Sequence, residues 1–121
     1  QGRCFIGNVG DSEVVLGRRV NGGEIRCDIL TEVHSVARNS SEATRILEAG
    51  GRVWHKRLAH PKFNPRICSL AISRSIGDLF FKDDESLEGA SSGLIADPYI
   101  TTVTWDPAGK LEHILILGCD G

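Results

Sequence analysis

Short apolar runs that end in turn residues are the feature that most constrains how this chain folds. Residues Ile114 to Leu117 are wholly apolar and are followed by Gly118-Cys119-Asp120-Gly121. In the same way Cys4 to Val9 leads into Gly10-Asp11-Ser12, after which Val14-Val15-Leu16 resumes the apolar pattern. A short apolar run bounded by turn residues predicts a strand that is buried on both faces.

Each of these two runs places an aspartate, Asp120 or Asp11, on the turn that follows a strand. Carboxylates held rigidly at strand ends are suited to share a hard cation such as Mg²⁺ or Mn²⁺. The alternative is a structural role, because Asp-Gly is a common turn dipeptide and an Asp before Ser hydrogen-bonds its own turn. For either aspartate alone the structural role is favoured, and for the pair within the wider pattern below the metal role is favoured.

Composition narrows the class of protein. The 121 residues are 40% hydrophobic and 25% charged, and the net charge of -2 argues against a dedicated nucleic-acid binder. The sequence predicts no signal peptide and no membrane segment. Four widely spaced cysteines without a Cys-x-x-Cys pair fit reduced thiols better than a disulfide framework or a zinc site. We therefore expect an intracellular protein, cytoplasmic or nuclear, and, since the chain starts with glutamine, an internal piece of a larger domain.

The strand pattern predicts antiparallel sheets. Cys4 to Val9, Glu13 to Arg19 and Glu24 to Ile29 read as three consecutive strands of a meander, with a hairpin signal at Asn21-Gly22-Gly23. Tyr99 to Trp105 is a further strand, and after a turn at 106–109 Leu111 to Leu117 is expected to return as its buried partner.

One helix is predicted between these strand regions. Asn39 is a helix cap with Glu42 as its capping-box partner, and Gly50-Gly51 ends the helix. One helical face carries Ala43, Ile46, Leu47 and Gly50. A second helix is expected over Arg74 to Lys82, and a mobile surface loop over Asp83 to Gly93. Strands in hairpin order with helical insertions indicate an α+β architecture.

Two further segments contain residues with a possible chemical role, and each segment allows two interpretations. Between Arg52 and Arg66 lie five Lys or Arg, two His and no acid, which is either a solvated basic loop or a basic flap that helps to hold phosphorylated substrate. Cys68 and Arg74 have the Cys-x5-Arg spacing of cysteine-dependent phosphatases. Bulky Leu70 and Ile72 suit a packed segment instead, and no His precedes Cys68 to lower its pKa.

Five segments together resemble the metal-dependent type 2C (PPM) serine/threonine protein phosphatases. Gly7 to Arg18 is similar to the family's "ANVGDSRAVL", and Leu70 to Asp78 is similar to "LAVSRAIGD". The three other segments are similar to "LTxDH…E..RI..AGG.V", "I.AEP.V" and "LILASDG"; they are Leu30 to Val53, Leu94 to Ile100 and Leu115 to Gly121. The segments follow the family's order and span nearly the whole chain.

The resemblance implies a sandwich of two antiparallel β-sheets flanked by helices, of which residues 1–121 are the middle portion. The family's early Asp-Gly-His-Gly-Gly segment and its late Asp-Asn segment are not in the chain. The implied activity is hydrolysis of phosphoserine and phosphothreonine by a metal-bridging water at a binuclear Mg²⁺/Mn²⁺ centre, with a third ion beside the two core ions. The implied partners are phosphorylated protein substrates, the complete domain is expected to be monomeric, and this fragment alone is expected to be inactive.

The resemblance also assigns roles to single residues. Asp120 stands at a core metal ligand, and Asp11 stands at a ligand to the additional, weaker metal. Asp78 is expected to pair or cap near Arg74, and Arg57 is expected to contact substrate from the flap. No catalytic residue is assigned within the fragment. The alternative to an enzyme is a catalytically silent pseudophosphatase scaffold, against which the presence of Asp11 and Asp120 argues, since a scaffold needs no carboxylate at the end of an apolar strand.

Overall fold

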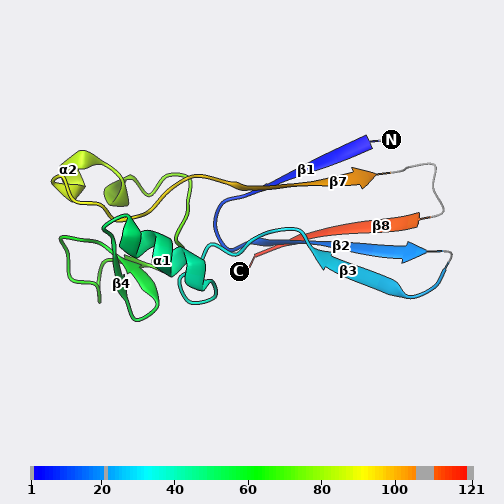
Figure 1. Cartoon of the computed structure of the whole chain (residues 1–121), viewed down its shortest axis with the longest axis horizontal. Coiled ribbons are helices and arrows are strands. Elements are labelled where there is room, and N and C mark those ends of the chain that lie inside the picture. The colour runs from blue at the N-terminus through cyan, green and yellow to red at the C-terminus, as the bar shows by residue number, and fades with distance from the viewer. Residues whose placement is uncertain (1, 21, 106–110, 120–121) are drawn as a thin grey trace. The chain divides into compact units, whose positions relative to one another are not determined.

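The computed structural model describes residues 2–20, 22–105 and 111–119 (Figure 1). The chain divides into two compact units: the first is Gln1–Asn8, Ser12–Glu32 and Pro98–Gly121, and the second is Val9–Asp11 and Val33–Asp97. Strands of the first unit are β1 (Gly2–Asn8), β2 (Glu13–Val20), β3 (Ile25–Ile29), β7 (Tyr99–Trp105) and β8 (Leu111–Gly118). Elements of the second are α1 (Ser40–Glu48), β4 (Arg52–Trp54), β5 (Arg57–Ala59), β6 (Ser69–Leu70), the 3-10 helix η1 (Leu79–Phe81) and α2 (Asp84–Leu87).

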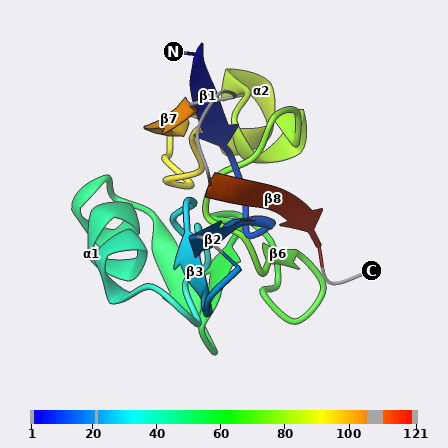
Figure 2. The same ribbon diagram turned by 90° about the vertical axis from the view of Figure 1, so that its right-hand side faces the viewer.

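Two antiparallel sheets make up the first unit. β1 pairs with β7 along its whole length, from Gly2 opposite Trp105 to Asn8 opposite Tyr99. β2 lies between β3 and β8 in the second sheet. Figure 2 shows the strands nearly end-on, with β1 and β7 in one layer and β8, β2 and β3 in the other. The expected α+β class with antiparallel sheets is confirmed.

The two sheets of this unit pack through apolar side chains. Alternate residues of a strand face opposite sides, so Val14 and Leu16 of β2 point inward together and are 8% and 1% exposed. Ile6 of β1 is buried from the other side. A small cavity between the layers is lined from both sheets by Cys4, Ile6, Leu16, Val103 and Leu115. The interior of this unit therefore consists of apolar side chains that point inward at alternate positions of short strands.

Strand pairing corrects two expectations. β1 does not pair with β2, so the three-stranded meander is wrong and only the β2–β3 hairpin of it exists. β7 and β8 likewise belong to different sheets and are not partners. The expected turn at 106–109 lies outside the described residues. The physical reason is that consecutive strands of a sandwich can cross between layers, whereas the apolar pattern specifies only which face is buried.

The other face of the β3-β2-β8 sheet is apolar and exposed. Val15 lies between Ile29 and Ile116, and Ile114 lies opposite Gly17. Ile29, Ile114 and Ile116 are 65%, 57% and 59% exposed. The run Ile114 to Leu117 is thus not buried on both faces in the described part of the chain, and Leu115 and Leu117 on its other face are also 37% and 71% exposed.

In the second unit, α1 begins and ends where the sequence predicts. Asn39 is its N-cap, and the Oδ1 atom accepts a hydrogen bond from the N–H of Ser41 at 3.1 Å. At the other end Gly50 has φ of 81°, and the N–H groups of Gly50 and Gly51 donate to the carbonyls of Leu47 and Ile46 at 3.0 and 2.8 Å. This paired pattern is the Schellman motif. Leu47 is 58% exposed, so the apolar face is narrower than expected.

Ile46 anchors the core of the second unit. Its fully buried side chain packs with Val36, Leu58, Phe81 and Leu94. Backbone approaches this core very closely: a Cβ atom on Gly51 would lie 2.3 Å from the carbonyl oxygen of Ser92. Glycine at position 51 therefore lets the 92–94 segment pack directly against the end of α1.

β4, β5 and β6 form a small antiparallel sheet beside α1. Residues Arg52 to Ala59 form a hairpin, β4–β5, in which Trp54 lies opposite Arg57. Its two loop residues, His55 and Lys56, both have positive φ, 45° and 61°. Positive φ at both central residues is what the type I′ hairpin turn requires, and its twist matches that of the flanking strands.

The second expected helix, Arg74 to Lys82, is wrong. Gly77 and Asp78 have φ of 87° and 49°, which a continuous right-handed helix does not accept. Only the single turn η1 follows. The loop expected over Asp83 to Gly93 is also partly wrong, because it contains α2, whose Leu87 is buried and whose cap Asp83 accepts a hydrogen bond from the N–H of Ser86.

Candidate metal and substrate site

The turn that carries Asp11 is held from within the second unit by one residue, His34. The N–H of Gly10 donates to Nδ1 of His34 at 3.2 Å, and the N–H of His34 donates to the carbonyl of Gly10 at 3.0 Å. His34 is fully buried. Gly10 has φ of 119°, a conformation that favours glycine. The backbone directly before Asp11 therefore has two fixed hydrogen bonds.

Asp11 itself is half-buried, and within the described residues its carboxylate makes no hydrogen bond or ion pair. The structural alternative, in which Asp11 bonds its own turn, thus has no such bond to support it here. The neighbouring strand ends are joined instead by Asn8, whose Nδ2 donates to the carbonyl of Ser12 at 3.0 Å. A carboxylate on a fixed turn, with both oxygens open, suits a hard divalent cation.

The other predicted ligand, Asp120, lies outside the described residues, which end at Cys119. Among the residues that the structure describes, no group of three or more His, Cys, Asp or Glu side chains is arranged to hold a metal ion. Of the two predicted ligands, Asp11 therefore lies within the described residues and Asp120 does not. Further ligands would have to come from Asp120 and from outside the described ranges.

A buried charge cluster centred on Glu42 was not predicted. The Glu42 carboxylate is 2% exposed and accepts hydrogen bonds from Arg74 Nη2 at 2.7 Å, Arg45 Nη2 at 2.9 Å and Ser73 Oγ at 2.6 Å. Burial alone raises the pKa of this carboxyl, but the hydrogen bonds from Arg74, Arg45 and Ser73 outweigh it and lower the pKa from 4.5 to about 2. Glu42 is therefore ionised near neutral pH.

The Glu42 cluster ties three segments of the second unit together. Arg45 also donates to the carbonyls of Gly93 at 2.8 Å and Ser73 at 3.0 Å, and Arg74 donates to the carbonyl of Asp97 at 2.9 Å. The expected capping-box role of Glu42 is thus wrong: Asn39 caps α1, and the Glu42 side chain points to Arg74. One signal in the sequence could have revealed this, since Glu42 lies on the same helical face as Ile46 and a buried charge needs a partner.

The cluster also corrects the expectation for Asp78. Its side chain makes no capping bond, although Asp78 precedes η1, and the residue is exposed. Arg74 pairs with Glu42 rather than with Asp78. The sequence could not distinguish the two acids, because the pairing partner of Arg74 lies 32 residues away.

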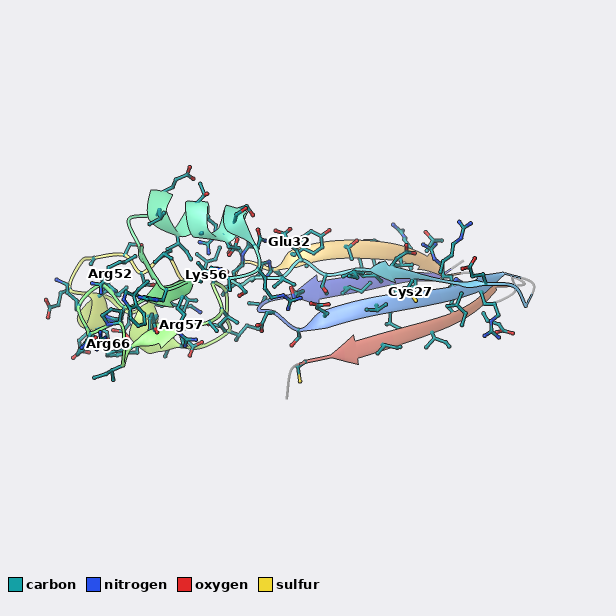
Figure 3. The ribbon with its side chains drawn as sticks, turned by 90° about the horizontal axis from the view of Figure 1, so that it is seen from below. Cys27, Glu32, Arg52, Lys56, Arg57 and Arg66 are labelled. Atoms are coloured by element: carbon teal, nitrogen blue, oxygen red, sulfur yellow. The ribbon has the colours of Figure 1, made fainter. Side chains whose placement is uncertain are left out.

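The basic segment includes the β4–β5 hairpin, to which Arg52, Lys56 and Arg57 belong, and Arg66 follows it in the chain; Figure 3 labels all four residues. Arg57 is half-buried, and its Nε and Nη2 donate to the hydroxyl and the carbonyl of Ser69, each at 2.9 Å. These bonds fix the guanidinium on β6 and leave Nη1 without a described partner. Arg52, Lys56 and Arg66 are exposed. The role of Arg57 toward substrate remains a prediction.

The cysteine-phosphatase alternative does not fit the second unit. Cys68 packs against the core around Ile46, and burial raises the pKa of its thiol, which disfavours the nucleophilic thiolate. The guanidinium of Arg74, which would have to bind phosphate in that mechanism, is committed to Glu42. Cys68 is thus a packing residue.

The comparison with known proteins agrees with the motifs. The family model described as "Protein phosphatase 2C" matches residues 1–121, and the chain therefore belongs to the protein phosphatase 2C family. The recognition made from the five sequence segments is confirmed.

Curated relatives match over almost the whole chain. It is 35% identical to Protein phosphatase 2C homolog 1 of Saccharomyces cerevisiae over 100% of this chain and 34% of that protein. It is 34% identical to Protein phosphatase 2C homolog 2 of Schizosaccharomyces pombe (97% of this chain, 27% of that protein). It is 33% identical to Protein spalten of Dictyostelium discoideum (98% and 11%). The chain thus spans about a third or less of the length of these relatives. Within residues 2–20, 22–105 and 111–119 the structure has no helix that could span a membrane.

Proposed function

We propose that the domain containing this chain is a Mg²⁺- or Mn²⁺-dependent protein serine/threonine phosphatase. The observation that carries the proposal is the family match over all 121 residues, which includes both aspartates. The substrates would be phosphoserine and phosphothreonine side chains of proteins. This chain by itself is proposed to be inactive, because the family's Asp-Gly-His-Gly-Gly and Asp-Asn segments are not in it.

In this proposal the chain's own residues bind metal and orient substrate. When bound, a pair of divalent ions would lower the pKa of the attacking water and neutralise charge on the phosphate. Asp120 would supply an oxygen ligand in the core metal centre, and Asp11 would supply one to a third, weaker site. Arg57 would face the phosphoprotein from the β4–β5 hairpin, where the hydrogen bonds to Ser69 hold its guanidinium. The open carboxylate of Asp11 on a fixed turn supports its part of this assignment.

The test uses the complete domain with a phosphopeptide and a Mn²⁺ titration. Asp120→Asn is expected to nearly abolish hydrolysis while the circular dichroism spectrum stays unchanged, since an amide is a much weaker ligand for a hard cation than a carboxylate. Asp11→Asn is expected to reduce activity mainly at low Mn²⁺. Asp84→Asn, at an exposed position in α2, is the matched control and should leave both rate and metal dependence unchanged.

The scaffold alternative has its own outcome in this experiment. A folded complete domain that neither binds Mn²⁺ nor releases phosphate would make the protein a pseudophosphatase scaffold. Hydrolysis that survives excess EDTA would contradict the metal mechanism.

A further inference from the structure

The segment before Asp11 is a glycine turn that does not fix its own conformation. Gly10 has φ of 119°, and glycine has wide backbone freedom because it lacks a Cβ atom. A metal ligand needs the opposite, namely a carboxylate held within a fraction of an ångström of its coordinating position. Some other residue must therefore restrain the turn.

The Asn8–Ser12 hydrogen bond spans the turn, and His34 is the residue that restrains Gly10 itself. It reaches across 24 positions of sequence to accept the Gly10 N–H on Nδ1, and its own N–H donates to the Gly10 carbonyl. Both polar groups of Gly10 are thus bonded to one buried residue. Because Nδ1 accepts, the ring proton of neutral His34 lies on Nε2.

His34 is itself held in place. Its carbonyl accepts the N–H of Ser73 at 2.9 Å, and the Ser73 hydroxyl donates to the buried carboxylate of Glu42 at 2.6 Å. Glu42 in turn is bound by Arg45 and Arg74. A continuous series of hydrogen bonds therefore runs from α1 to the turn of Asp11, wholly within the second unit.

We propose that His34 is a positioning residue for the Asp11 carboxylate: its imidazole and main chain hold the Gly10–Asp11 turn in the conformation that binds the weaker divalent ion. The inference rests on the proposed function, because it takes Asp11 as a ligand. His34 touches neither metal nor substrate in this role. It acts through the hydrogen bond from Gly10.

A matched pair of substitutions separates this role from simple packing. The side-chain amide of His34→Asn reaches the position of Nδ1 and can accept the Gly10 N–H through its oxygen, whereas that of His34→Gln reaches the position of Nε2. Both variants are polar and similar in size. In the complete domain, the weaker class of Mn²⁺ sites is measured by electron paramagnetic resonance of free Mn²⁺, and the Gly10 amide is followed by hydrogen exchange.

We expect His34→Gln to weaken the low-affinity Mn²⁺ site by about tenfold, the lower end of the range found for residues that orient metal ligands, and to speed exchange of the Gly10 amide. His34→Asn should restore most of both. Equal Mn²⁺ affinity and equal exchange in wild type and His34→Gln would overturn the inference, as would equal weakening in both variants at matched thermal stability.

Asp11→Asn distinguishes failure of this inference from failure of the proposed function. If Asp11→Asn weakens the low-affinity site but His34→Gln does not, only the positioning role is wrong. If Asp11→Asn leaves Mn²⁺ binding unchanged, the assignment of Asp11 as a ligand is wrong and the positioning role falls with it.

Discussion

Glu42 in the first turn of α1 and Arg74, 32 residues further on, form an ion pair of 2.7 Å in which the carboxylate is 2% exposed. Arg45 and Ser73 satisfy the remaining hydrogen-bonding capacity of that carboxylate. A buried charge with all of its partners present is stable, but removing one partner leaves the others desolvated and unpaired. The fold of the second unit therefore depends strongly on this pair.

Replacing Glu42 by Gln is expected to destabilise the complete domain by about 3 kcal/mol, because the half-buried guanidinium groups of Arg45 and Arg74 lose their counter-charge. Urea unfolding at neutral pH measures the change. Glu48→Gln, exposed at the end of the same helix, is the control and should change the free energy of unfolding by less than about 0.5 kcal/mol. Equal effects of the two substitutions would show that the Glu42 cluster contributes no more to the free energy of unfolding than an exposed glutamate does.

The same residue predicts a pH dependence. The pKa of Glu42 is about 2 in the folded protein, against 4.5 for the carboxyl without its partners. The contribution of Glu42 to the free energy of unfolding is therefore fully present above about pH 4.5 and is lost as pH falls toward 2. The difference in unfolding free energy between wild type and Glu42→Gln should shrink across this window. A difference that stays constant from pH 6 to pH 2.5 would contradict the lowered pKa.

Gly51→Ala is expected to be strongly destabilising, by about 2 kcal/mol or more, because the new methyl group would overlap the carbonyl oxygen of Ser92 at 2.3 Å and crowd Ile46. Thermal unfolding of the complete domain measures it. Gly118→Ala meets nothing within 4 Å and should leave the melting temperature almost unchanged. If the two variants have the same melting temperature, the close approach of the 92–94 segment to α1 is not present in solution.

Arg57→Leu is expected to raise KM for a phosphopeptide several-fold with kcat nearly unchanged, since the guanidinium is proposed to bind substrate and not the transition state alone. Steady-state kinetics of the complete domain give both constants. Arg66→Leu removes an exposed arginine from the same basic segment and serves as the control for net charge. A KM that rises equally in both variants would point to the charge of the whole segment rather than to Arg57.

Cys68→Ser should keep metal-dependent hydrolysis within about twofold of wild type, because the thiol packs against the core and its pKa is raised. Phosphate release in Mn²⁺ is the measurement. Complete loss of activity in a variant with unchanged circular dichroism would return the thiol to the list of candidate nucleophiles.

Local features were readable from single stretches of sequence. Asn39 and Gly50-Gly51 bound α1 as predicted, because caps depend on residues within one turn of the helix end. The β2–β3 hairpin follows in the same way from its glycine turn. The predicted helix over Arg74 to Lys82 is wrong because Gly77 and Asp78 have positive φ values, which a continuous right-handed helix does not accept.

The candidate site divides along the same line. Its aspartates stand out in the sequence because each follows an apolar strand, and the five segments fixed the family from the sequence alone. The tertiary structure alone decided that β1 pairs with β7 and β2 with β8, that Glu42 binds Arg74 instead of capping its helix, and that His34 binds Gly10. Each of these contacts joins groups that are between 24 and about 100 residues apart in the sequence. Such contacts depend on how apolar faces pack and on which partner a buried charge finds, and the sequence pattern around one residue specifies neither of these.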